Sequence, residues 1–151
     1  MPPPTGSAGR WRLILTAAGA VGLVTAVVGT FLPWLKSGSV QRNSYAAGGA
    51  VRRLLRLDHT LYDLLAAWPL IAIVAALAVA ATVLGRPVVG LALALLVAAA
   101  GGTCAGVVLT VHGNRYAQVV TTGPRTTLVG AMLVALTGLI AACAAFARRT
   151  R

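Results

Sequence analysis

The sequence predicts an all-α membrane protein, a bundle of four transmembrane helices with an amphipathic segment and a small β cap in its loops. Four apolar stretches contain no Asp, Glu, Lys, Arg or His. Each reaches the roughly 20 residues that a helix needs to cross a bilayer. The whole chain of 151 residues is 58% hydrophobic and 10% charged, whereas a soluble domain carries about 25% charged residues. The stretches cover residues 13–35, 64–85, 87–111 and 126–147.

We expect one membrane domain, residues 13–147, between a disordered N-terminal tail, residues 1–12, and a basic C-terminal tail, residues 148–151. The first nine residues are rich in Pro, Gly and Ser, which is typical of a disordered terminus. Arg10 and Arg12 precede the first stretch as in a signal peptide. That stretch is longer than the usual apolar core of about 7–15 residues, and we expect an uncleaved first helix.

The net charge of +11 arises from 13 Lys and Arg against two acidic residues. Because these cations lie in loops and tails beside apolar stretches, they indicate topology control and contact with anionic lipid headgroups, and not nucleic-acid binding. Cations directly at the ends of the stretches favour a cell (inner) membrane protein with both termini in the cytoplasm. The basic cluster of residues 52–56 argues for the opposite orientation. The cations on the terminal side are Arg10, Arg12, Arg86, Arg148, Arg149 and Arg151.

Small residues recur at intervals of four in the first and third stretches, and therefore share one face of each helix. Small faces allow close approach of two helix backbones in a membrane. One interpretation is an interface with a partner protein, and the other is packing inside the bundle itself. The candidate partner-packing positions are Ala18, Gly22, Ala26, Ala98, Gly102 and Gly106.

The loop of residues 36–63 has a polar first part and a second part with helical periodicity. Residues 50–65 place apolar side chains on one side and Arg, His and Asp on the other, which predicts an amphipathic helix in the interface plane. The second transmembrane helix is expected to begin near Leu61, with Pro69 kinking it. Residues 115–120 are expected to form a short strand that pairs with residues 37–41.

Aromatic and basic residues gather in this same loop. Arginine binds phosphate or carboxylate through two parallel hydrogen bonds, which suggests contact with a lipid headgroup or an acidic partner loop. The alternative is a solvated basic face at the membrane surface. The candidate contact residues are Trp34, Arg42, Tyr45, Arg52, Arg53 and Arg56.

Groups capable of catalysis are scarce. A metal site from His59, Asp63 and His112 is one hypothesis, but no spacing motif joins these residues. In the alternative, the two acids pair with nearby arginines and cap the second helix. We find no phosphate-binding glycine loop and no nucleophile with a base at fixed spacing. The expectation is a protein that is not an enzyme, with no catalytic residue, metal or cofactor.

The two cysteines are expected to be free, buried thiols. In antiparallel third and fourth helices, Cys104 and Cys143 would lie about 10 Å and about 24 Å from the shared loop end. A disulfide requires Cα atoms within about 7 Å of each other. The same separation excludes a metal motif formed by this pair.

A resemblance rests on the run Phe31-Leu32-Pro33-Trp34-Leu35-Lys36-Ser37-Gly38, followed by Arg42-Asn43-Ser44-Tyr45. This run resembles the first loop of small four-helix membrane proteins from actinobacteria. Some proteins of this kind look like accessory subunits of cell-envelope transporters, including lipid importers of the mammalian-cell-entry type. The resemblance implies no catalytic residues.

Together these features predict a non-catalytic accessory subunit that docks on, and stabilises or regulates, a larger cell-envelope transport complex. Its partners would be membrane lipids and that complex. The alternative is a small homo-oligomeric transporter or lipid-binding membrane protein. Because an ionisable group at membrane depth usually marks an ion or proton pathway, the charge-free stretches argue against ion coupling.

Overall fold

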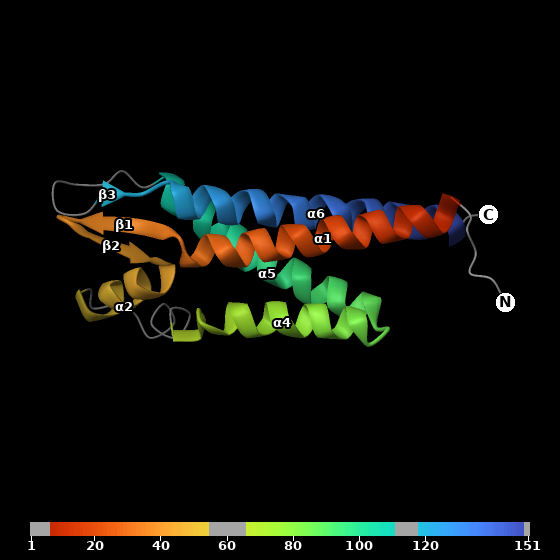
Figure 1. Cartoon of the computed structure of the whole chain (residues 1–151), viewed down its shortest axis with the longest axis horizontal. Coiled ribbons are helices and arrows are strands. Elements are labelled where there is room, and N and C mark those ends of the chain that lie inside the picture. The colour runs from red at the N-terminus through yellow and green to blue at the C-terminus, as the bar shows by residue number, and fades with distance from the viewer. Residues whose placement is uncertain (1–6, 55–65, 111–117, 150–151) are drawn as a thin grey trace.

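The computed structural model describes residues 7–54, 66–110 and 118–149 (Figure 1). It confirms a mostly helical chain with a small sheet, and three of the described helices are long and apolar enough to cross a membrane. The helices are α1 (Ser7–Phe31), α2 (Ser44–Leu54), α4 (Leu70–Val83), α5 (Pro87–Thr110) and α6 (Thr122–Arg149). The strands are β1 (Pro33–Ser37), β2 (Val40–Asn43) and β3 (Gln118–Val119).

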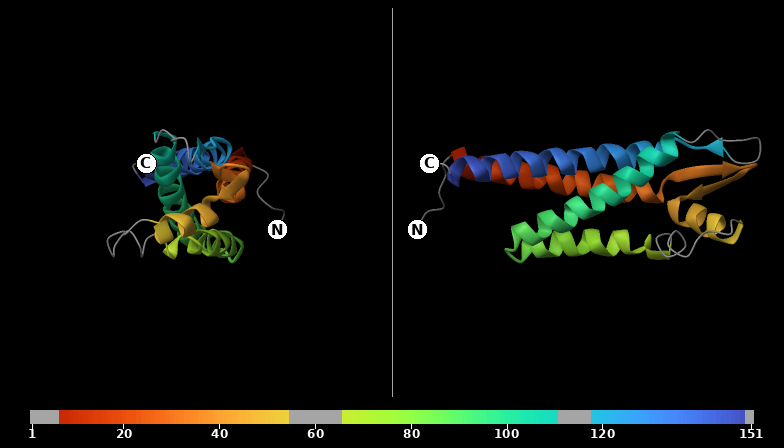
Figure 2. Two further views of the ribbon diagram at one scale, coloured as in Figure 1. Left: turned by 90° about the vertical axis from the view of Figure 1, so that its left-hand side faces the viewer. Right: turned by 180° about the vertical axis from the view of Figure 1, so that it is seen from behind.

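Helices α1 and α6 lie side by side along the long axis, and α5 crosses them diagonally to reach α4 (Figure 1). Viewed along that axis, the helices follow the order α1, α6, α5, α4 around the bundle (Figure 2). The start of α1 and the end of α6 lie at one end of the bundle, which we call the terminal end. The sheet and α2 lie at the other end and form the cap. Helix α4 packs mainly on α5, so its side facing α1 is only loosely filled.

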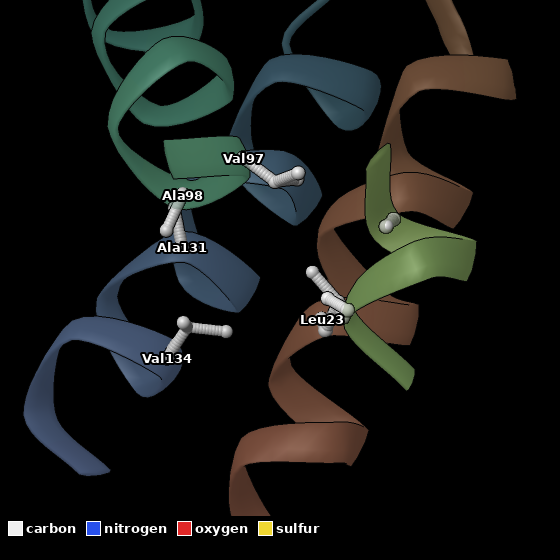
Figure 3. Close-up of a cluster of buried hydrophobic side chains, with 7 residues drawn as sticks. Leu23, Val97, Ala98, Ala131 and Val134 are labelled. Atoms are coloured by element: carbon white, nitrogen blue, oxygen red, sulfur yellow. The ribbon is translucent and has the colours of Figure 1, made fainter. Parts of the chain in front are cut away.

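Small residues bring the backbones of α1 and α6 into direct contact. A Cβ added to Gly22 would lie 3.0 Å from the carbonyl oxygen of Gly130. A Cβ added to Gly130 would meet the backbone of Gly22 and Ala26. The adjoining core is assembled from all four long elements of the bundle (Figure 3). Its buried members are Leu23, Ala75, Ala78, Val97, Ala98, Ala131 and Val134.

A second close approach lies nearer the cap, where Gly29 of α1 faces Thr127 of α6. The Thr127 hydroxyl oxygen is buried and has no hydrogen-bond partner among the described residues. A Cβ at Gly29 would collide with this oxygen and with the Thr127 backbone. The close approach of the two helices at this point therefore depends on glycine.

Helices α4 and α5 form a hairpin through a Schellman turn. Gly85 has a positive φ of 75°, the Arg86 amide donates to the Ala81 carbonyl, and the Gly85 amide donates to the Thr82 carbonyl. These are the two bonds of that helix ending. Gly90 then packs on Ala78, because a Cβ there would lie 2.8 Å from the Ala78 carbonyl oxygen.

The second apolar stretch is interrupted where the sequence predicts a kink. Residues 66–67 are helical, a turn occupies residues 68–69, and α4 begins at Leu70 with Pro69 as its N-cap residue. At 14 residues, α4 is about 21 Å long, whereas a hydrocarbon core is ~30 Å thick. The predicted helix start near Leu61 and the second half of the predicted amphipathic helix lie outside the described residues.

Helices α1 and α6 differ from their predicted bounds. Helix α1 begins at Ser7, so residues 7–12 of the predicted tail are helical, and it ends at Phe31 instead of residue 35. Pro33 explains the early end, since proline disfavours helical backbone at the preceding residue and has no amide hydrogen. Helix α6 begins at Thr122, ahead of the predicted residue 126, with Pro124 tolerated in its first turn.

The cap sheet has the order β2-β1-β3, with both pairings antiparallel. Gly38, with φ of 61°, turns the chain between β1 and β2, as expected for glycine at the first position of a tight hairpin turn. The predicted pairing of residues 115–120 with 37–41 is therefore shifted. Residues 38–39 form the turn, and β3 pairs with Leu35 and Lys36 of β1.

We predict that Gly130→Ala destabilises the protein by about 1–3 kcal/mol, because the new methyl group must push α1 away from α6. Thermal unfolding in detergent micelles measures the effect. Gly106→Ala is the matched control, since nothing lies within 4 Å of a Cβ at that position. Equal melting temperatures for the Gly130 variant and the wild type would contradict the close packing of α1 on α6.

Candidate functional site

The cap is attached to the bundle through the carbonyl groups at the C-terminal end of α1. The last four carbonyls of a helix have no partner within it. The Trp34 indole Nε1 donates to the Gly29 carbonyl at 2.8 Å, and the Ser44 hydroxyl donates to the Thr30 carbonyl at 2.7 Å. Residues from β1 and α2 therefore satisfy the end of α1 and fix the cap in place.

Two aromatic residues extend this attachment. The Trp68 indole Nε1 donates to the Ser44 hydroxyl at 3.0 Å, and its ring packs edge-on against Trp34 at a centroid distance of 6.2 Å. The Tyr45 hydroxyl shares a hydrogen bond of 2.9 Å with the Thr30 hydroxyl. We call Thr30, Trp34, Ser44, Tyr45 and Trp68 the indole cluster. It joins α1, the sheet, α2 and the segment before α4.

The candidate contact residues separate into buried and exposed groups. Trp34 is 3% exposed and its N–H group is already bonded, so it supports the cap from inside. Tyr45 is half-buried against Phe31, with ring centroids 5.0 Å apart. Arg42 is exposed on β2. Arg52 and Arg53 lie within α2, and Arg56 lies outside the described residues.

The outer surface of the cap is polar and positively charged. Lys36 pairs with Gln41 on one side and with Gln118 on the other, so the three side chains cross one face of the sheet, and all are exposed. Arg42, paired with Leu35, lies on the other face. The sequence did not identify Lys36 as a candidate contact residue, because its neighbours Gln41 and Gln118 depend on the register of the strands.

The small-residue positions are largely occupied within the chain. Gly22 and Ala26 contact α6, as described above, and Ala98 belongs to the buried core. A Cβ at Gly102 would lie 3.0 Å from Ala131. Ala18 is half-buried, and only Gly106 of this set has open space around it. Most of the six positions therefore pack on helices of the same chain, and less small-residue surface remains for a second protein.

The groups weighed for metal binding or catalysis are not among the described residues. They are His59, Asp63 and His112, together with Asp58. Within residues 7–54, 66–110 and 118–149, no group of three or more His, Cys, Asp or Glu could hold a metal ion. Both cysteines are free, as predicted, but Cys104 is half-buried and Cys143 is exposed on α6. The prediction of two buried thiols is therefore wrong.

The fold and the site together are consistent with a membrane protein that has a small polar cap at one end of its helices. Comparisons with protein-family models, curated proteins and solved structures give no match. Any functional assignment therefore rests on the geometry of this chain.

We predict that Ser44→Ala lowers the free energy of unfolding by about 2–4 kcal/mol, because it removes two hydrogen bonds and leaves the Thr30 carbonyl and the Trp68 indole without partners. The melting temperature in detergent, monitored by tryptophan fluorescence, measures the effect. Ser39→Ala, in the exposed hairpin turn, is the control and should change stability by less than about 0.5 kcal/mol. The same loss in both variants would refute the role assigned to Ser44.

Proposed function

We propose that this chain is a non-catalytic accessory subunit that docks through its cap on a larger cell-envelope transport complex. The observation that carries the proposal is the rigid attachment of a positively charged sheet by the indole cluster. A surface held by buried hydrogen bonds loses little conformational entropy when it binds. Lys36 and Arg42 are exposed on opposite faces of the sheet, and each favours acidic groups on a partner that contacts its face.

The proposal includes four membrane crossings. Helix α1 ends at the cap, whereas α5 starts toward the opposite end of the bundle (Figure 1). The chain between them must return across the membrane, and α4 runs along α5 in that direction. The described residues 66–69, directly before α4, add to the length of its 14 residues. We further propose a cell (inner) membrane location with both termini in the cytoplasm and the cap on the outer side.

The alternative is a homo-oligomeric transporter or lipid-binding protein. One observation favours lipid binding, namely an apolar hollow of about 310 Å³ bordered by α1 and α4. A transport pathway has less support, because this hollow is open to the side and its lining contains no charged residue.

Charge reversal on the cap tests the accessory role. We predict that affinity-purified wild-type protein carries a stoichiometric membrane-protein partner, and that the Lys36→Glu, Arg42→Glu double variant loses at least about 90% of it, since each like-charge contact disfavours docking. Quantitative mass spectrometry measures the ratio. Arg86→Glu, at the far end of the bundle, should keep the partner. A wild-type protein that purifies alone would contradict the proposal.

Cysteine labelling tests the orientation. In a background with Cys104 and Cys143 replaced by Ala, Ser39→Cys in the cap turn should react with a membrane-impermeant maleimide in intact cells. Arg86→Cys, at the opposite end, should react only after the membrane is opened. Electrophoretic mobility after labelling gives the readout, and the reverse pattern would place the termini outside.

A further inference from the structure

An apolar groove runs between α1 and α4 over the terminal half of the bundle. Its walls include Leu15 and Ala20 of α1 and Val79 and Val83 of α4, and its floor includes Leu91 and Val134. The volume is about 310 Å³. A second hollow of about 250 Å³ shares Leu23 and Val79 with the first and continues toward the cap. We call the first hollow the α1–α4 groove.

The lining of the groove offers a ligand hydrocarbon contacts. It contains no charged residue. Thr82 donates its hydroxyl hydrogen to the Ala78 carbonyl at 2.9 Å, and Thr137 donates to the Leu133 carbonyl at the same distance. With these donors already used inside their own helices, a polar ligand would gain little from them. The lining therefore selects an apolar occupant.

The length of the groove along the bundle suits an acyl chain that enters from one leaflet. From Leu15 to Leu23 the groove covers about 12 Å of α1, close to half of a ~30 Å hydrocarbon core.

Positive charge lies at the outer end of this groove. Arg86 stands between Val83 on the groove wall and Pro87, which also lines the groove, and its side chain is exposed. The only acidic residues of the chain, Asp58 and Asp63, occur between α2 and α4 in the sequence. A cation beside the end of an apolar groove matches a phosphate joined to an acyl chain.

We propose that the α1–α4 groove binds one anionic phospholipid from the leaflet on the terminal side. One acyl chain occupies the groove, and the phosphate lies beside Arg86. This site lies at the opposite end from the cap and does not depend on the accessory role.

Lipid retention tests the proposal. The protein is reconstituted with equal amounts of phosphatidylglycerol and phosphatidylcholine, purified in mild detergent and weighed by native mass spectrometry. The wild type should retain one phosphatidylglycerol per chain. Ala20→Phe, which places a ring in the groove, should reduce retention of both lipids at least tenfold. Arg86→Gln should reduce the preference for phosphatidylglycerol by about tenfold, because the choline cation of phosphatidylcholine repels Arg86 whereas the neutral glycerol of phosphatidylglycerol does not.

Matched controls separate this site from general effects. Ala135 is exposed on α6 and absent from the groove lining. Ala135 also lies at about the same depth along the bundle axis as Ala20, since Gly19 adjoins Thr137 and Gly22 adjoins Val134. Ala135→Phe should keep the lipid, and Arg125→Gln, which removes one cation near the cap, should keep the preference. The proposal is overturned if the wild type holds no lipid, if Ala20→Phe retains it, if the preference survives Arg86→Gln, or if the controls lose as much as the test variants.

Discussion

The hydrogen bond from the Trp34 indole to the Gly29 carbonyl is the interaction on which the rest of the cap depends. It occurs where α1 stops, at a point where backbone carbonyls have no helical partner. The same ring packs against Gly123 at the start of α6 and against Trp68 before α4. The Trp34 carbonyl also accepts the Val120 amide at 2.9 Å. One buried side chain thus sets the ends of three helices relative to one another.

The two ends of the bundle differ because of this arrangement. At the cap, indoles and hydroxyls draw α1, α6 and the start of α4 together. Toward the other end, α4 is held by α5 through Gly90 and has no comparable contact with α1. Close packing of α1 on α6 through Gly22 and Gly130 leaves α1 unable to move toward α4. The α1–α4 groove therefore results from two close helix contacts. Gly22 and Gly130 hold α1 on α6, and Gly90 holds α5 on α4.

Three of the four apolar stretches correctly predicted a helix long enough to cross a membrane, because length and the absence of charge are strong signals there. In the second stretch, the described helix α4 has only 14 residues. An interruption at Pro69 was also predictable, as a kink, since a proline inside a helix lacks the amide hydrogen that would bond to the preceding turn. The hairpin of residues 33–43 was not predicted, because its register depends on a tight turn at Gly38 and on pairing with a segment distant in sequence. The predicted role of Trp34 in headgroup contact overlooked its burial, which no local pattern shows. Small-residue spacing identified contact faces but could not say whether the contacting helix belonged to the same chain.

The cap and the groove offer different chemistry to different partners. Lys36, Gln41 and Gln118 face water on a sheet whose supporting hydrogen bonds are already made, so a partner there must supply polar or acidic groups. The groove, by contrast, has used its hydroxyls internally and admits hydrocarbon. Because the fold fixes both surfaces independently, a subunit docked on the cap would leave the groove open to the bilayer. A lipid filling the groove would in turn add packing contacts between α1 and α4, which pack least closely of the neighbouring pairs among α1, α4, α5 and α6.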